Sequence, residues 1–361
     1  MLIIDSHLDL AANAVYWDRD LRLEIDQIRA GEAGMTGKGR GNNTVSLPEM
    51  RRGRVAVASA PLLARTGSSP SPGLPSYSSA TIAYAVAHGQ LAYYRLLEDL
   101  GEVRIVRTRD ELAAHWREWE AWDAAPTQNG RAPGLIISME GADAVVSPDQ
   151  IRTWWDGGLR ILGMTHYQES AYAHGTGSEG GLKPPARELL EGMREVGMIL
   201  DVTHLADQSF WEALDSWDGP VIASHNNCRA LVPGQRQFSD EQIEAIVERG
   251  GVIGCALDAW MLYQGWVRGE TSPDVVDLEA YVDHIVHICE LAGNGSHAAI
   301  GSDLDGGFGN EQTPRDLRSI ADLQKVPDML KGRGFSDDDV AAVMHGNWVR
   351  FFGRHLPAPM R

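Results

Sequence analysis

Residues 198–225 read MILDVTHLADQSFWEALDSWDGPVIASH and contain two short apolar runs, residues 198–202 and 220–224. A histidine follows each run closely, His204 after the first and His225 after the second. Short apolar runs of this kind are typical of buried strands in a parallel sheet. The same pattern recurs along the chain, so the number of runs decides the architecture.

Eight such runs alternate with longer segments of helical periodicity, which favours repeated strand–helix units over a sandwich. The predicted strands are residues 2–5, 55–60, 135–139, 159–165, 198–202, 220–224, 252–256 and 298–301. A ninth run, residues 103–106, has arginines at 104 and 107, and we expect it to be peripheral. Eight strands with intervening helices predict an α/β fold, a (β/α)8 TIM-like barrel.

Helices are predicted from their periodicity and their end signals. Ser147 and Pro148 begin one that Gly157 ends, and Ser239 with Gln242 reads as a capping box. The other predicted helices, with the one that this capping box opens, cover residues 81–100, 111–122, 185–196, 241–249, 275–291 and 337–352.

The composition is that of a folded, acidic protein. The 361 residues sum to a net charge of −18, which argues against nucleic acid and anionic membranes as partners. The three cysteines, Cys228, Cys255 and Cys289, are too few and too scattered for a disulfide framework and fit a reducing compartment. Without a secretory signal or a run of about 18 apolar residues, we expect a cytoplasmic protein.

No repeat or compositional boundary divides the chain, so we expect one barrel domain over residues 1–361. Two stretches lack the strand–helix rhythm, the Gly-rich residues 31–43 and the Ser/Pro-rich residues 66–79. They are predicted to be long loops at a barrel end, and a solvated linker and a substrate-covering lid remain equal alternatives for them.

Ionisable side chains follow most of the predicted strands. In a barrel of this type the chemistry lies where the strands end, at the carboxyl-terminal mouth. His7 and Asp9 are two residues apart, so both should point the same way. The residues expected to converge on this mouth are His7, Asp9, Glu140, His166, His204, His225, Asp303 and Asp305.

Each of these residues alone has an ordinary structural explanation, because a strand-end Asp often caps a helix and most lone histidines are hydrogen-bonded core residues. Structural roles do not explain why all of these residues lie at the same end of successive strands, because helix caps and core histidines are not restricted to that end. So many carboxylates and imidazoles would be costly to desolvate unless a cation organised them.

Nitrogen and carboxylate ligands without thiolate favour Zn²⁺, and Mn²⁺, Co²⁺ or Fe²⁺ are possible on geometry. The cluster holds enough ligands for two metals. None of the four lysines ends a strand, so a carboxylated lysine is not expected as a bridge. Glu140 is the natural bridging ligand instead.

Motifs for other chemistries are absent from the sequence, which has no phosphate-binding P-loop, no Gly-x-Ser-x-Gly elbow and no His-Glu-x-x-His helix. The other histidines fall mainly in helices or loops and are interpreted as structural or surface residues: His88, His115, His174, His284, His287, His297, His345 and His355.

Together, these motifs resemble in order the signatures of the membrane (renal) dipeptidase family, peptidase family M19, of the metal-dependent amidohydrolase superfamily. The resemblance spans essentially the whole chain. It is carried by His7-x-Asp9, Met139-Glu140-Gly141, Thr165-His166, Asp201-Val202-Thr203-His204, Ser224-His225-Asn226, Gly301-Ser302-Asp303-Leu304-Asp305-Gly306 and His345-Gly346-Asn347-Trp348-Val349-Arg350.

The resemblance implies a metal-dependent-hydrolase barrel that acts as a dinuclear zinc dipeptidase. By this resemblance, one zinc is held by His7, Asp9 and Glu140. The other is held by Glu140, His204 and His225.

Substrate-binding and catalytic roles also follow from the resemblance. His166 would polarise the scissile carbonyl, Asp303 would shuttle the proton, and Arg236 would bind the substrate's terminal carboxylate. Arg229, the nearest rival of Arg236, is interpreted as structural. A hydroxide held between the two cations would attack the peptide carbonyl, and Asp303 would pass the proton to the leaving amine.

The chain departs from the family pattern beside two of the motifs. Ser6 and Leu8 stand where the family commonly has Gly and Asn, and residues 168–170 lack an Asn common after the fourth strand. We expect these changes to alter the pocket, so the side-chain preference of the substrate, including L or D at the C-terminal residue, stays open.

Two alternatives to the dipeptidase hypothesis remain. A related barrel hydrolase acting on another amide or on a lactone would keep the metal ligands but not need Arg236. An inactive binding protein has less support, because no catalytic position of the pattern is missing. A dipeptide is the expected small-molecule partner, and the resemblance makes a homodimer possible.

Overall fold

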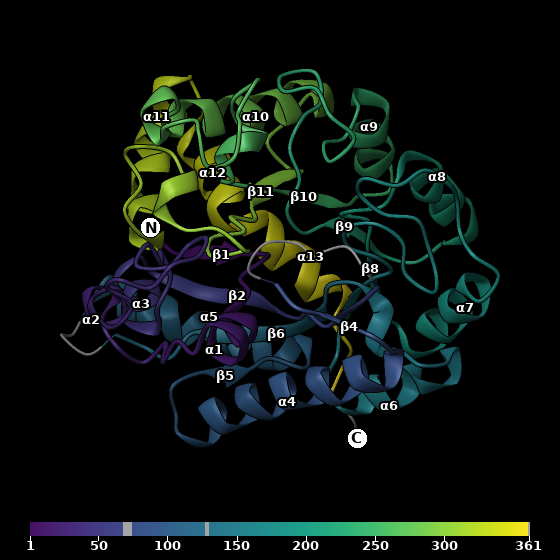
Figure 1. Cartoon of the computed structure of the whole chain (residues 1–361). Helices are drawn as coiled ribbons and strands as arrows, with labels where there is room; N and C mark the ends of the chain where they lie inside the picture. Colours follow the sequence, from purple (N-terminus) through teal and green to yellow (C-terminus); the bar gives the residue numbers. More distant parts are fainter. Residues whose placement is uncertain (68–73, 127–129, 360–361) are drawn as a thin grey trace.

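Eight parallel strands form the centre of the protein in a computed structural model that describes residues 1–67, 74–126 and 130–359. Their order in the sheet is the order of the chain. They are β1 (Ile3–Asp5), β2 (Val55–Leu62), β6 (Gly134–Met139), β7 (Ile161–Gly163), β8 (Ile199–Asp201), β9 (Val221–Ala223), β10 (Val252–Cys255) and β11 (Ala298–Ile300). The amide of Ser6, just after β1, donates to the carbonyl of Ile300 at 3.1 Å. The first and last strands therefore meet, which confirms the predicted barrel (Figure 1).

Each predicted apolar run overlaps one barrel strand, with ends that differ by one to a few residues. The largest difference is the run 159–165, of which only Ile161–Gly163 is strand. The peripheral run is also confirmed, because β5 (Arg104–Ile105) pairs only with the start of β6. Two strands were not predicted, β3 (Arg65–Thr66) and β4 (Ser76–Tyr77), which pair with each other outside the barrel. Strands of two residues are too short to show a period in the sequence.

Helices surround the barrel in the described part of the chain (Figure 1). The α-helices are α1 (Leu10–Trp17), α2 (Ile25–Gly31), α3 (Leu47–Arg52), α4 (Ala80–Asp99), α5 (Arg109–Ala124), α6 (Ile151–Asp156), α7 (Ala186–Val196), α8 (Asp207–Ser216), α9 (Asp240–Glu248), α10 (Leu278–Ala292), α11 (Val326–Gly332), α12 (Asp337–Ala341) and α13 (Asn347–His355). Short 3-10 turns are η1 (Ala142–Ala144), η2 (Pro148–Gln150), η3 (Ala259–Met261), η4 (Pro273–Val275), η5 (Asn310–Gln312) and η6 (Ile320–Lys325), and η7 (Ala342–Gly346) is a π-turn.

The predicted helices are all present, but sequence periodicity missed α1, α2, α3, α8 and α11. These helices have ten residues or fewer, and α1 is buried at most of its positions, so its sequence shows no polar face. The predicted capping box is formed. The backbone amide of Gln242 donates to the hydroxyl of Ser239, and the backbone amide of Ser239 donates to the side-chain oxygen of Gln242. The predicted helix 337–352 is continuous only through the π-turn between α12 and α13. No helix among the described residues is long and apolar enough to cross a lipid bilayer.

The amino-terminal end of the barrel is closed by the C-terminal helix. Trp348 and Phe352 of α13 pack in one buried cluster with residues from the starts of the strands, including Leu2, Ile4 and Val252. The indole of Trp348 donates to the carbonyl of Ile300 at 3.0 Å. Within the described residues this end is therefore sealed, and the cavity that a substrate could enter lies at the carboxyl-terminal mouth.

Inside the barrel, two glycines make room for a serine. The hydroxyl of Ser6 donates to the carbonyl of Ser224 and lies 3.1 Å from the carbonyl oxygen of Ile300. A Cβ atom on Gly254 or Gly301 would collide with the carbonyl oxygen of Ser224 and lie within 3.0 Å of the Ser6 hydroxyl. The narrow interior therefore fixes the distance between the strands that carry His7, His225 and Asp303.

We predict that Gly301→Ala destabilises the protein by about 2 kcal/mol or more, because backbone atoms of neighbouring strands cannot move away from the added methyl group. The measurement is the free energy of unfolding in urea. Gly353→Ala is the matched control, since Gly353 lies in α13 with nothing within 4 Å of its added Cβ, and alanine favours a helix. Equal stability of the two variants would show that the barrel interior accommodates the added methyl group without a steric clash.

Candidate metal centre and active site

The ionisable residues predicted at the barrel mouth do come together there, with one exception. They follow the carboxyl ends of β1, β6, β7, β8, β9 and β11, and all are buried or nearly so. The residues that meet are His7, Asp9, Glu140, His166, His204, His225 and Asp303. The exception is Asp305, whose carboxylate turns away and accepts hydrogen bonds from the backbone amides of Thr44 and Val45.

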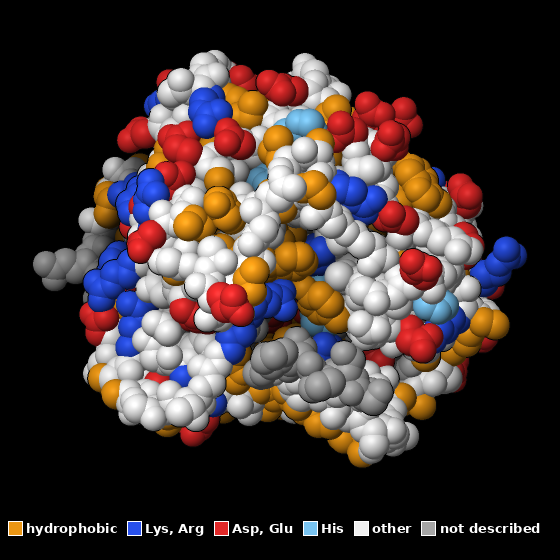
Figure 2. Space-filling model, turned by 45° about the horizontal axis from the view of Figure 1, so that its top comes forward, with side chains coloured by type: hydrophobic (Ala, Val, Ile, Leu, Met, Phe, Trp, Pro, Cys, Tyr) orange, Lys and Arg blue, Asp and Glu red, His pale blue; other side chains and the backbone are white. Residues whose placement is uncertain are grey.

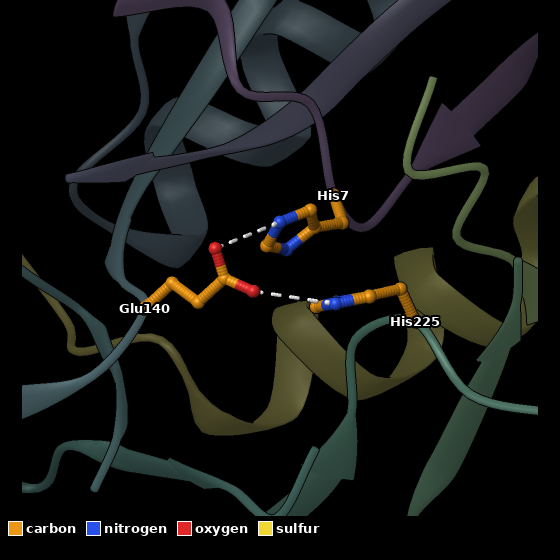
Figure 3. A group of neighbouring side chains, drawn as sticks. All are labelled: His7, Glu140 and His225. Carbon is orange, nitrogen blue, oxygen red and sulfur yellow. Dashed lines mark ion pairs between the residues drawn. The ribbon is translucent and has the colours of Figure 1, made fainter. Parts of the chain in front are cut away.

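Glu140 lies at the centre of the cluster, between two groups of histidines. Its Oε2 is 3.7 Å from Nε2 of His7. Its Oε1 is 3.2 Å from Nε2 of His204, 3.3 Å from that of His225 and 3.6 Å from that of His166. Figure 3 shows the carboxylate pointing toward His7 and His225, which both lie across the site from the backbone of Glu140. Each carboxylate oxygen therefore faces a different set of nitrogen atoms.

Hydrogen bonds on the far side of the rings fix the histidines. The hydroxyl of Thr176 lies 3.0 Å from Nδ1 of His204. The hydroxyl of Ser224 lies 2.9 Å from Nδ1 of His225 and 3.4 Å from that of His7. Contacts at Nδ1 orient each ring so that Nε2 faces Glu140, as second contacts commonly do for metal-binding histidines.

His166 is held by an arginine that sequence analysis did not single out. Nη1 of Arg65 lies 3.4 Å from Nδ1 of His166. A guanidinium only donates hydrogen bonds, so Nδ1 of His166 is the acceptor and the ring hydrogen is on Nε2. That N–H group faces the cavity and Glu140.

Two site residues have an unusual backbone. His204 and Asp303 have φ angles of 68° and 57°, in the left-handed region that non-glycine residues seldom adopt. Such positions cost about 1 kcal/mol or more each, and they concentrate at functional sites, where the turn aims a side chain. In Asp303 the turn places the carboxylate 3.9 Å from Nε2 of His7.

The site favours an anionic Glu140 and neutral imidazoles at two histidines. Burial raises the pKa of Glu140, but electrostatic attraction to the imidazoles of His166 and His7 and hydrogen bonds from His204 and His225 outweigh it and hold this pKa well below its ordinary value. Burial lowers the pKa of His204 and of His225 well below the ordinary value. A neutral imidazole is the form that binds a metal.

The pKa values of His7 and Asp303 are raised instead. Burial lowers the pKa of His7, but Glu140 and Asp9 outweigh it and raise that pKa well above its ordinary value. Burial, together with the charges of Asp9 and Glu140, raises the pKa of Asp303 well above its ordinary value. In the protein alone, the negative charge around His7 therefore attracts a positive charge, which a proton or a metal cation can supply.

The donor atoms fit divalent cations. Nε2 of His7 and Oδ1 of Asp9 are buried and have no hydrogen-bond partner among the described residues. Three groups have donor atoms within 4.8 Å of one another, and Glu140 belongs to two of them. The groups are His7 with Glu140 and His225, Glu140 with His166 and His204, and His7 with Asp9 and Asp303. Imidazole and carboxylate ligands without thiolate suit zinc and related divalent metals.

The cavity above this cluster has further walls that were not predicted. They contain Lys38, Leu74, Tyr167, Asp258, Trp260, Met261, Arg268, Gly306 and Gly307, beside the predicted Arg236. Asp258 and Trp260 lie shortly after β10, so the rule that located the other residues at strand ends could have found them. Lys38 lies in the Gly-rich stretch that was predicted to be a loop at a barrel end, but nothing in the sequence marks Lys38 itself or Arg268.

The two candidate arginines have different environments. Arg236 is buried at the cavity, where its guanidinium donates to Oδ1 of Asn226 at 2.7 Å and to the carbonyl of His225 at 2.8 Å. Arg229 does not line the cavity, and it forms a two-point ion pair with Asp207 at 3.0 and 2.7 Å. The structural interpretation of Arg229 agrees with this pair.

The residues that depart from the family pattern do not line the cavity, and their effect on the pocket stays a prediction. Ser6 and Leu8 are fully buried, and the Ser6 hydroxyl bonds to the barrel backbone. Glu169 pairs with Lys183 at 2.7 Å, and Ser170 donates to the carbonyl of Met164. Positions next to a metal ligand alternate in direction along the strand, so they can face the core instead of the pocket.

The two predicted loops both reach the cavity. Residues 31–43 contain no strand and supply Lys38, and the loop 66–79 supplies Leu74. Residues 68–73 of the second loop lie outside the described residues.

The chain resembles known proteins along its whole length. The model of a family described as membrane dipeptidase (peptidase family M19) matches residues 1–356. The dipeptidase tcpJ of Claviceps purpurea is 28% identical over 228 residues, which are 60% of this chain and 50% of that protein. An uncharacterised protein of Klebsiella pneumoniae is 25% identical over 241 residues, 64% of this chain and 85% of that one. The matched part thus spans about half the length of the fungal relative.

Two solved structures share the fold. The crystal structure of dipeptidase AC, a metallopeptidase of family M19, has a TM-score of 0.78 at 22% identity and covers 99% of both chains. A metallopeptidase from Rhodobacter sphaeroides, bound to a phosphinate mimic of the dipeptide L-Ala-D-Ala, also has a TM-score of 0.78, at 21% identity over 98% of this chain and 99% of that chain.

We predict that Glu140→Gln lowers the content of bound divalent metal far more than any single change at an outer residue, because both groups of nitrogen donors lose their shared anion. The measurement is metal per chain by mass spectrometry after dialysis against zinc. Glu191→Gln, on the exposed side of α7, is the matched control. Full metal content in Glu140→Gln would contradict a central role for this carboxylate.

Proposed function

Because the chain belongs to the membrane dipeptidase family, peptidase family M19, we propose that it is a metal-dependent dipeptidase that cleaves dipeptides with a free C-terminal carboxylate. The observation that carries the proposal is the position of Glu140. Its Oε2 faces His7, its Oε1 faces His204 and His225, and the buried Arg236 lines the same cavity. A shared carboxylate between two cation sites, next to a cation for the substrate, suits hydrolysis of a short peptide.

We propose that two zinc ions are held at this site, with Glu140 bridging them. His7 and Asp9 would complete one site, and His204 and His225 the other. The buried, unpartnered atoms of His7 and Asp9 support the first site, and the short distances from Oε1 of Glu140 support the second. His225 also lies within reach of His7, so its nitrogen is near both sites. When bound, such ions activate water as a nucleophile near neutral pH and polarise a carbonyl group.

His166 is proposed to bind the scissile carbonyl. Its Nε2–H group faces the cavity because Arg65 occupies Nδ1. Burial lowers the pKa of His166 to about 4, so the ring is neutral near neutral pH and donates without carrying a charge into the site. A donor fixed in this way stabilises the negative charge that develops on the carbonyl oxygen.

Asp303 is proposed to move the proton from the attacking water to the leaving amine. Its carboxylate lies at the cavity beside His7 and within reach of Asp9. Burial raises its pKa well above the ordinary value, which makes it a better proton acceptor than an exposed carboxylate. The left-handed turn at Asp303 holds this group in place.

Arg236 is proposed to bind the terminal carboxylate of the substrate. The guanidinium donates one hydrogen bond to Asn226 and one to the carbonyl of His225, and an arginine has five N–H donors. The remaining donors suit two-point recognition of a carboxylate. An ester, amide or lactone without that carboxylate would leave the buried charge of Arg236 unpaired.

The C-terminal residue of the substrate is proposed to include D residues. This extension rests on the likeness in fold to the Rhodobacter sphaeroides metallopeptidase, whose ligand mimics L-Ala-D-Ala. A single domain over residues 1–361, a cytoplasmic location and a homodimer stay predictions.

We expect the zinc-loaded protein to release free amino acids from dipeptides and not from their C-terminal amides. The test is a panel of L-L and L-D dipeptides, the matching amides, an N-acyl amino acid amide and a γ-lactone. Hydrolysis of the lactone or of blocked amides, with intact dipeptides left uncleaved, would instead identify a related hydrolase that does not need Arg236.

The same panel tests Arg236 directly. Arg236→Gln should abolish the preference for a free carboxylate over an amide, and it should act mainly on KM for the free dipeptide. Arg152→Gln, an exposed change on α6, is the matched control. Because Arg236 also bonds to the backbone of His225, metal content and unfolding free energy are measured alongside.

We predict that Asp303→Asn lowers kcat by about 100-fold to 10,000-fold, the range for loss of a positioned general acid–base group. The amide keeps the size of the side chain but cannot accept and return the proton. Metal per chain is measured in the same preparation, so that a loss of metal is not taken for a loss of proton transfer. Full kcat with metal bound would show that another group moves the proton.

A further inference from the structure

The outer wall of the cavity contains two cationic side chains that the proposed mechanism does not use. They are Lys38, from the loop after α2, and Arg268, from the loop after η3. Neither forms an ion pair with a carboxylate in the described part of the chain. In a protein with a net charge of −18, two unpaired cations in one cavity are an unusual local arrangement.

Aromatic rings, instead of carboxylates, hold both cations. The ammonium of Lys38 lies 5.9 Å from the ring centroid of Phe308. The guanidinium of Arg268 lies 4.9 Å from the ring centroid of Trp260. Cation–π contacts restrict where the charges lie but do not neutralise them. Figure 2 shows a hollow in one face of the molecule with hydrophobic, Lys and Arg side chains at its border.

One buried carboxylate is close enough to affect both cations, and it is already engaged. Asp258 accepts from the side-chain amide of Gln312 at 2.5 Å and from the backbone of Trp260 at 3.4 Å. Burial raises the pKa of Asp258, while Lys38 and Arg268 oppose that rise. Glu311 and Asp303 also attract Lys38, but among the described residues no carboxylate forms an ion pair with Lys38 or with Arg268.

The like charges also act on each other. Burial lowers the pKa of Lys38, Asp258 opposes this, Arg268 lowers the pKa further, and Glu311 and Asp303 also oppose the lowering. Bringing two cations together in a partly desolvated wall costs free energy unless an anion binds between them. The proposed mechanism already assigns the terminal carboxylate of the substrate to Arg236, and it assigns no anion to Lys38 or Arg268 in the same cavity.

Building on the proposed dipeptidase function, we propose that Lys38 and Arg268 form a subsite for a carboxylate on a substrate side chain. The preferred substrates are therefore dipeptides that contain aspartate or glutamate. An acidic side chain neutralises the wall, a neutral one leaves its charge unpaired, and a basic one is repelled.

The test compares isosteric substrates that differ only in charge. The substrates are Ala-Asp against Ala-Asn and Asp-Ala against Asn-Ala, each with an L or a D residue at the C-terminus. We expect kcat/KM for an aspartate dipeptide to exceed that of its asparagine partner about tenfold or more, as for a charge-assisted pair in a partly buried site. The position with the larger ratio identifies which residue of the substrate meets the wall.

Variants of Lys38 and Arg268 test whether these two residues, and not another part of the site, cause the preference for acidic dipeptides. The double change Lys38→Gln with Arg268→Gln should bring the aspartate-to-asparagine ratio of kcat/KM close to one. Lys38→Glu should shift the preference toward a lysine dipeptide. Arg152→Gln with Lys331→Gln, two exposed changes on α6 and α11, is the control with the same loss of charge, and it should keep the wild-type ratio.

The outcomes distinguish the two proposals. Equal turnover of aspartate and asparagine dipeptides by the wild type would overturn this subsite and leave the dipeptidase function in place. An acidic preference that survives the double change would also overturn it. No turnover of any dipeptide by the zinc-loaded protein would reject the proposed function itself.

Discussion

The desolvation of Glu140 is the constraint on which the mouth of the barrel depends. A carboxylate loses several kcal/mol of hydration when it is buried, and it stays ionised only if positive charge or hydrogen bonds surround it. The strand β6 carries it to the centre, and its amide bonds to the carbonyl of Leu62 on β2 at 3.1 Å. Imidazoles from several other strands then approach both of its oxygens. The closed barrel supplies what this arrangement needs, because strands far apart in the sequence end within a few ångströms of one carboxylate.

The rigid support of the histidines follows from the same geometry. Ser224 is the residue before His225, and its hydroxyl approaches Nδ1 of both His225 and His7, while its carbonyl accepts from Ser6. One residue thus links the positions of two ligand candidates to the narrow interior of the barrel. A change in strand spacing there would move both rings, so the packing of Gly254 and Gly301 and the chemistry at the mouth are not independent.

The order of residues along the chain made most of the central cluster predictable. Parallel strands in a barrel all end at one mouth, so an ionisable residue after each apolar run can be placed without knowing any side-chain contact. Asp305 shows where this reasoning fails. Two left-handed residues, Asp303 and Asp305, form a turn that aims the first carboxylate into the site and the second at the backbone of Thr44. Strand periodicity does not extend into such a turn. The short helices α1 and α8 were missed for a related reason, because ten residues or fewer carry too little periodic signal.

The residues proposed to select the substrate could not be found in this way. Lys38 and Arg268 reach the cavity from long loops, where neither alternation nor helical spacing fixes the direction of a side chain. Their proposed role is inferred from distances in the folded protein. Both cations lie beside aromatic rings, and the carboxylate of Asp258 is already hydrogen-bonded to Gln312. Carboxylates and imidazoles lie at the strand ends, and positive charge lies in the outer wall. A substrate with two carboxylates therefore meets cations at Arg236 and at the wall while its peptide bond lies over the strand-end cluster. This separation of the strand-end cluster from the cations of the wall follows from the architecture. The barrel fixes the positions of the strand ends, whereas the sequence of the loops above them can vary without disturbing the barrel.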